Sequence, residues 1–244
     1  MTRIQLKKQK QLMDTKWKDL YKIGGISFII TTVLILFAII AFFIWPYSPS
    51  ENTTADILTT LDNDIWKGLF SLDLIMLITM LVNIFPLLAL YVSLKNVNES
   101  YALIAFVLAL IGVATIIPAR PLQEMVILSE KYAQAKTEIE RNIYLASGET
   151  YLALFDGTAW LVQTVLLMLS GLINALLMLK SKMFSKTTAW IGIIAAALGF
   201  GFFIPKIGVG FLFLNTILTI PFYILIALVF IKIGWHNKIN IETN

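Results

Sequence analysis

Six side chains that can carry charge or hydrogen bonds lie near the ends of long apolar segments and are candidates for ligand binding. They are Asp73, Arg120, Gln163, Asn215, Glu149 and Asp156. A carboxylate and a guanidinium can bind opposite charges of a small polar molecule, and side-chain amides can add hydrogen bonds. Ionisable groups inside a membrane are costly, so they mark a candidate functional site. We predict an outward-facing polar cavity in which Asp73 and Arg120 pair and the other four residues contribute to binding.

The same residues also fit a purely structural role. Asp73 and Arg120 could form an ion pair that holds two helices together, or Asp73 could cap a helix. Interhelical polar contacts contribute about 0.6–2 kcal/mol each, which is reason enough for a helix bundle to keep a few. Glu149 and Asp156 would share one helix face if the helix between them were continuous. Both interpretations stay open at this point.

The composition excludes several kinds of chemistry. The chain has no cysteine and one histidine, His236, so disulfides, iron–sulfur clusters, cysteine zinc sites, bis-histidine haem ligation and HExxH metalloprotease chemistry are excluded. Ser170 has no histidine or intramembrane lysine to activate it, and Asp73 has no second intramembrane aspartate for an aspartyl dyad. We therefore expect no enzymatic activity, no cofactor and no metal.

The elements that must position these residues are membrane helices. Of the 244 residues, 58% are hydrophobic and only 14% are charged, whereas soluble domains carry about 25% charged residues. Several apolar runs reach the roughly 20 residues that span a bilayer. We predict an all-α polytopic membrane protein with six transmembrane helices in a bundle. The predicted spans are 25–45, 69–94, 102–117, 158–179, 189–204 and 211–231. The third and fifth are short for a spanning helix.

The distribution of charge predicts the orientation of the chain. With both termini cytoplasmic, the inner segments hold 13 of the 19 basic residues but only 4 of the 15 acidic ones, as the positive-inside rule requires. Membrane topology thus accounts for the basic character, and we expect no nucleic acid partner. The first apolar run is followed by Trp45-Pro46-Tyr47 rather than by small residues, so it is expected to be a retained helix. The expected location is the plasma (inner) membrane of a prokaryote.

Three regions follow from this topology. Residues 1–23 should form a basic amphipathic cytoplasmic segment, either in the membrane interface or as a solvated tail. Residues 24–232 form the membrane domain, and residues 233–244 form a cytoplasmic tail. Within the outer loop 121–157, helical spacing predicts two short amphipathic helices lying over the outer face, one begun by a Thr137–Glu140 capping box.

Small residues predict close helix packing at one place. The fifth span carries Gly192 and Gly199 among alanines, and the fourth offers Gly171 and Ala175 as a matching surface. Small residues at such spacing let two membrane helices approach closely. We therefore predict that the fourth and fifth helices form a tight antiparallel hairpin.

Several short motifs resemble those of a known family. They are LSEKYAQA at 128–135, ER at 140–141, ASGE at 146–149, LMLKSKMFSK at 177–186 and AWIGI at 189–193. The chain resembles, best over residues 116–232, a widespread bacterial and archaeal family of six-helix membrane proteins catalogued only as a domain of unknown function. The resemblance implies a six-helix inner-membrane bundle. It brings no activity, cofactor or catalytic residue with it.

Two functional classes remain. The first is a module that binds or transports a small polar or amphipathic ligand, since polar residues gather at the outer ends of the spans. The alternative is a non-catalytic scaffold, regulatory or stress/immunity subunit that acts through protein contacts. The expected partners are the lipid bilayer and then either a small ligand, a protein partner or a second copy of the chain.

Overall fold

The computed structural model describes residues 16–46, 49 and 52–235, and every regular element within them is a helix. Six stretches are long and apolar enough to cross a membrane, as predicted. They are built from α2 (Lys18–Ile44), α6 (Leu74–Val82) with α7 (Ile84–Leu94), α8 (Glu99–Ala119), whose stretch continues to Gln134, α11 (Thr158–Lys180), α12 (Lys186–Phe200) with η1 (Gly201–Phe203), and α13 (Gly208–Trp235). The chain is therefore a multi-pass membrane protein.

Several predicted boundaries need correction, and α2 and α13 extend beyond the predicted first and sixth spans, 25–45 and 211–231. The third span is not short, because α8 begins three residues before the predicted start and continues past Pro118 to Ala119. The second predicted span, 69–94, is not one helix. It begins inside the short helix α5 (Ile65–Ser71), is interrupted at Leu72 and Asp73, and is interrupted again at Asn83 between α6 and α7. Pro86 contributes to the second interruption because it cannot donate to the Val82 carbonyl.

The chain divides into two compact units. The first consists of Met1–Thr32, Val82–Leu108 and Met168–Asn244, and the second of Val33–Leu81 and Ala109–Leu167. The core of the first unit includes the fully buried side chains of Phe28, Met178 and Phe230.

The basic segment 1–23 differs from its prediction where the structure describes it. Leu20 and Tyr21 lie in the first turn of α2, and Tyr21 is buried against Phe230 with ring centroids 5.3 Å apart. Trp17 packs partly against the same core, with the ammonium group of Lys95 5.1 Å from its ring centroid. These residues therefore extend a membrane helix rather than form a separate interfacial one. Residues 1–15 and most of the predicted tail, 236–244, lie outside the described residues.

The second unit carries four additional helices at one end. These are α4 (Thr54–Asn63), α5, α9 (Leu122–Gln134) and α10 (Glu138–Leu152). They enclose a core that includes Leu58, Leu72, Met125 and Phe155, all fully buried. α10 begins with the predicted capping box of Thr137 and Glu140.

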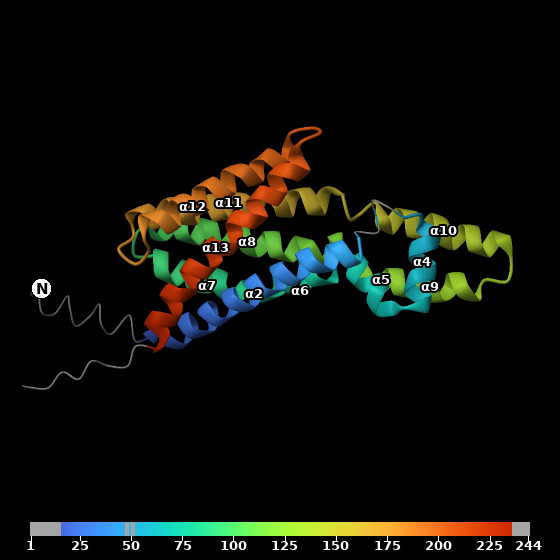
Figure 1. Ribbon diagram of the computed structural model, residues 1–244, viewed down its shortest axis with the longest axis horizontal. Coiled ribbons are helices and arrows are strands. Elements are labelled where there is room, and N and C mark those ends of the chain that lie inside the picture. Colours follow the sequence, from blue (N-terminus) through green and yellow to red (C-terminus); the bar gives the residue numbers. More distant parts are fainter. Residues whose placement is uncertain (1–15, 47–48, 50–51, 236–244) are drawn as a thin grey trace, which may run out of the picture. The chain divides into compact units, whose positions relative to one another are not determined.

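The arrangement of α9 and α10 differs from the prediction that two helices lie over the outer face. α9 continues beyond α8 in nearly the same direction, and α10 returns beside it as the second half of a hairpin (Figure 1). The hairpin thus projects along the helix axis. It is held there by α4, since Gly148 of α10 fits against Thr54 and Leu58.

Close packing in the first unit involves α12 with both α11 and α13. A methyl group added at Gly192 would lie 2.6 Å from the ring of Phe222 in α13 and 3.0 Å from Cβ of Ala175 in α11. Gly199 fits in the same way against Met168 of α11. The predicted contact between the fourth and fifth helices is present, but Gly171 takes no part in it. A methyl group there would meet nothing within 4 Å among the described residues.

Candidate ligand-binding site

Asp73 occupies a break in the backbone between α5 and α6. Its φ angle is 71°, in the left-handed region that aspartate and asparagine tolerate better than other residues with a side chain. The carbonyl oxygen of Asp73 accepts hydrogen bonds from the amides of Met76 (3.0 Å) and Leu77 (3.3 Å), which begins α6. The carboxylate does not cap the helix and is left to make contacts elsewhere.

Arg120 is the partner of this carboxylate and is almost completely buried, with 2% of its side chain exposed. Its Nε and Nη2 atoms donate to Oδ2 of Asp73 at 3.1 and 3.0 Å, and Nη1 donates to the carbonyl oxygens of Ala119 (2.9 Å) and Phe155 (3.0 Å). The remaining Nη2 hydrogen faces the sulfur of Met76 at 3.9 Å. All five N–H donors of the guanidinium are thus engaged by the protein.

Two aromatic rings complete the surroundings of Arg120. The guanidinium carbon lies 5.0 Å from the ring centroid of Phe155 and 4.7 Å from that of Trp160. Arg120 therefore ties together the α5–α6 break, the end of α8, the turn after α10 and the first turn of α11. It has no donor left for an anionic ligand, and its role here is structural.

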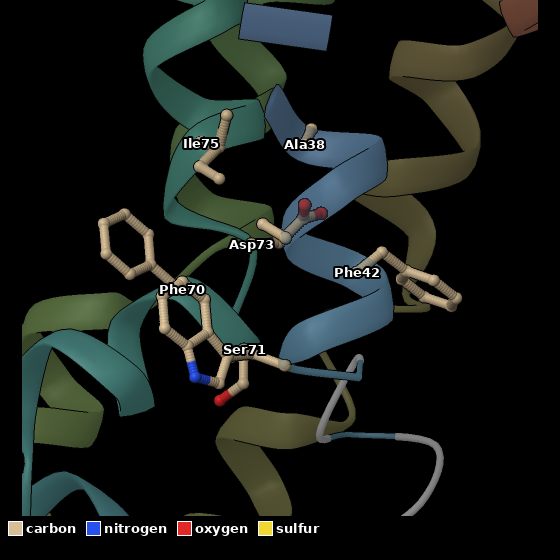
Figure 2. A pocket seen from close by; sticks show the side chains of 8 residues that line it. Ala38, Phe42, Phe70, Ser71, Asp73 and Ile75 are labelled. Carbon is tan, nitrogen blue, oxygen red and sulfur yellow. The ribbon is translucent and has the colours of Figure 1, made fainter. Parts of the chain in front are cut away.

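Asp73 itself keeps an open side. Oδ1 has no hydrogen-bond partner among the described residues, and 27% of the side chain is exposed. The carboxylate faces a small pocket between α2 and the α5–α6 break, about 40 Å³ in volume, shown in Figure 2. The pocket is lined by Ala38, Ala41, Phe42, Trp45, Phe70, Ser71, Asp73 and Ile75. The hydroxyl of Ser71 already donates to the carbonyl of Gly68 at 2.9 Å, so Asp73 and Ser71 offer mainly acceptor oxygens, and the indole N–H of Trp45 is the donor among the other lining side chains.

The pocket lining does not include the other predicted site residues. Gln163 is buried in the same unit, and its Oε1 has no partner among the described residues. Asn215 lies in the other unit, where Nδ2 donates to the Ala195 carbonyl at 2.7 Å and so joins α13 to α12. Glu149 and Asp156 are exposed and do not share a helix face, because α10 ends at Leu152 and α11 begins at Thr158.

Comparison with known proteins gives a family but no function. The model of a family described as "Domain of unknown function (DUF4386)" matches residues 23–234. The chain belongs to this family. No curated protein matches it significantly, and neither does any solved structure. Membership of the family therefore brings no activity or ligand to this DUF4386 chain.

Sequence reasoning missed the aromatic wall of the pocket. The rings of Trp45 and Phe70 stack with centroids 5.4 Å apart and an interplanar angle of 10°. Both lie near the ends of apolar runs, where tryptophan is common at the membrane–water interface. That position could have indicated an aromatic cluster at the membrane interface, although it does not tell which acidic residue the rings approach.

The first unit contains a buried hydroxyl whose removal should stabilise the protein. Oγ1 of Thr31 has no partner among the described residues and Thr31 is 0% exposed, whereas Oγ1 of its neighbour Thr32 donates to the Phe28 carbonyl at 2.8 Å. An unpaired buried polar group costs about 1–3 kcal/mol. Thr31→Val should therefore raise the melting temperature in detergent, and the matched control Thr32→Val should leave it unchanged or lower it. A loss of stability in Thr31→Val would show that this hydroxyl has a partner, such as a buried water.

Proposed function

We propose that this protein binds a small cationic group in the pocket at Asp73, as a ligand-binding or transport-related protein of a prokaryotic plasma membrane with both termini cytoplasmic. The observation that carries the proposal is that the two oxygens of the Asp73 carboxylate have different surroundings. Oδ2 is held by Arg120, while Oδ1 has no hydrogen-bond partner among the described residues, and Asp73 lines the pocket. Arg120 fixes the carboxylate, and the pocket presents its free oxygen.

The chemistry of the pocket favours a cation over an anion. A carboxylate oxygen can only accept hydrogen bonds, and the Ser71 hydroxyl already donates its hydrogen bond to the Gly68 carbonyl. Phe42, Trp45 and Phe70 also line the pocket, and aromatic side chains attract cations rather than anions. An anion would meet the acceptor oxygens of Asp73 and Ser71, with the neutral indole N–H of Trp45 as a donor, and the donors of Arg120 are fully engaged.

Thermal unfolding in detergent tests the proposal, with a panel of small cations that includes sodium, ammonium and ethylammonium. A ligand at 100 times its dissociation constant should add about 2.7 kcal/mol of stability. We expect at least one cation to raise the melting temperature of the parent protein and not that of Asp73→Asn. The control is Asp62→Asn, which removes an exposed carboxylate of α4. A shift retained in Asp73→Asn, or no shift with any cation, would contradict the proposal.

A second candidate function is supported by a different observation. Ile139 and Ile143 are exposed on α10, one turn apart, and Ile139 is 75% exposed. Exposed apolar residues that lie together on one face mark protein contacts. Under this alternative the hairpin of α9 and α10 binds a protein partner. Site-specific crosslinking from position 143 should then trap one defined product, and Ile139→Asp should abolish it.

A further inference from the structure

The size of the pocket limits what can enter it. We infer that the cationic group is the primary amine at the head of a membrane lipid, which reaches Asp73 sideways from the bilayer; this inference rests on the proposed function above. The pocket holds about 40 Å³, space for about three water-sized groups. Pockets that enclose a whole small molecule measure about 300–1,000 Å³. Only the end of a ligand fits, so the rest must lie outside.

The surface beside the pocket is suited to a hydrocarbon chain. The last turns of α2, which contribute Ala38, Phe42 and Trp45 to the pocket, expose apolar side chains on that side. Phe42 is 55% exposed, and Phe37, whose ring centroid lies 6.2 Å from that of Phe70, is 43% exposed. In a membrane helix such a face lies against lipid tails. An amphiphile bound at Asp73 would lay its chains along this face without displacing protein contacts.

The position of the pocket along the membrane normal fits the headgroup region of the bilayer. Asp73 immediately precedes the apolar helix α6, and Trp45 follows the last residue of α2. Trp66 extends the aromatic cluster, with its ring centroid 6.3 Å from that of Phe70. Tryptophan gathers where the hydrocarbon core meets the headgroups. A lipid amine and the Asp73 carboxylate would therefore meet at the same level.

The polar groups distinguish a primary amine from a quaternary one. An ethanolamine headgroup has three N–H donors, which match Oδ1 of Asp73 and the acceptor lone pairs of Ser71 Oγ. A choline headgroup has no N–H donor and carries three methyl groups into a small space. The site should thus prefer phosphatidylethanolamine over phosphatidylcholine.

Native mass spectrometry of the protein from nanodiscs tests this preference, with the two lipids in equal amounts and with identical acyl chains. We expect phosphatidylethanolamine to be retained about tenfold over phosphatidylcholine, as one charge-assisted hydrogen bond allows. The preference should vanish in Asp73→Asn and persist in Asp62→Asn. Ala38→Leu, which fills the pocket from α2 and leaves the Asp73–Arg120 pair intact, should also abolish it. This variant keeps the test decisive if Asp73→Asn does not fold.

A second arm uses free ethylammonium as the probe in detergent and separates the two proposals. If ethylammonium stabilises the protein and phosphatidylethanolamine displaces it, both the cation site and the lipid inference are supported. Stabilisation by ethylammonium with equal retention of the two lipids overturns the lipid inference and leaves the cation site standing. No effect of ethylammonium and no lipid preference overturns both.

Discussion

Arg120→Leu is expected to lower the free energy of unfolding by about 3–5 kcal/mol, as for other buried ion pairs that lose one partner. The change leaves the Asp73 carboxylate without its counter-ion and removes a donor from the carbonyl oxygens of Ala119 and Phe155. It also removes the cation from the rings of Phe155 and Trp160. Arg120→Lys keeps the charge but not the planar fork, so its loss should be intermediate. Unfolding in detergent, followed by tryptophan fluorescence, measures both losses.

Arg141→Leu is the matched control for this prediction. Arg141 is exposed on α10, and its guanidinium lies 5.6 Å from the ring centroid of Tyr132. Its replacement should change the free energy of unfolding by less than about 1 kcal/mol. A double-mutant cycle of Arg120→Leu with Asp73→Asn should give a clear coupling energy. Independent, additive losses would show that the pair does not stabilise the fold.

The second large effect is expected at Gly192. In Gly192→Ala the added methyl group would lie 2.6 and 2.8 Å from two ring carbons of Phe222, closer than packed carbon atoms lie. Since Ala175 closes the other side at 3.0 Å, the helices must move apart or the ring must rotate. Overpacking of this kind costs about 1–3 kcal/mol. The melting temperature in detergent should fall accordingly.

Gly171→Ala, the same change at another glycine, is expected not to lower the stability of the protein. The added methyl group meets nothing within 4 Å among the described residues, and alanine favours a helix over glycine by about 1 kcal/mol. This variant should be at least as stable as the parent protein. Phe222→Leu should recover part of the loss in Gly192→Ala. Equal effects of the two glycine substitutions would contradict the packing of α12 described above.

The membrane helices were predictable from sequence because a span depends on the hydrophobicity summed over about 20 residues. The interruptions inside the second span were harder to predict, since Asp73 lies in a run of apolar residues that predicts a continuous helix. Its left-handed backbone results from the junction of α5 and α6, which local sequence does not specify. The separation of α10 from α11 did have a signal. Asp156-Gly157 is a turn dipeptide, and it was sufficient to exclude a shared face for Glu149 and Asp156.

The candidate site was predictable in its charged pair and not in its surroundings. Opposite charges in adjoining membrane segments are expected to meet, and Asp73 and Arg120 do so. The saturation of Arg120 depends on backbone carbonyls of residues 119 and 155, whose positions no residue type encodes. Asn215 lies in the first unit and Asp73 in the second. Depth in the membrane places residues at one level without telling which neighbours they contact.

The central claim is that Asp73 offers a cation site, and equilibrium dialysis with radiolabelled ethylammonium tests it most directly. The purified parent protein and Asp62→Asn should bind one ion per chain with the same dissociation constant. Asp73→Asn, verified as folded by its melting curve, should bind none in the same concentration range. Equal binding by the folded Asp73→Asn protein, or no saturable binding by the parent protein, would contradict the account.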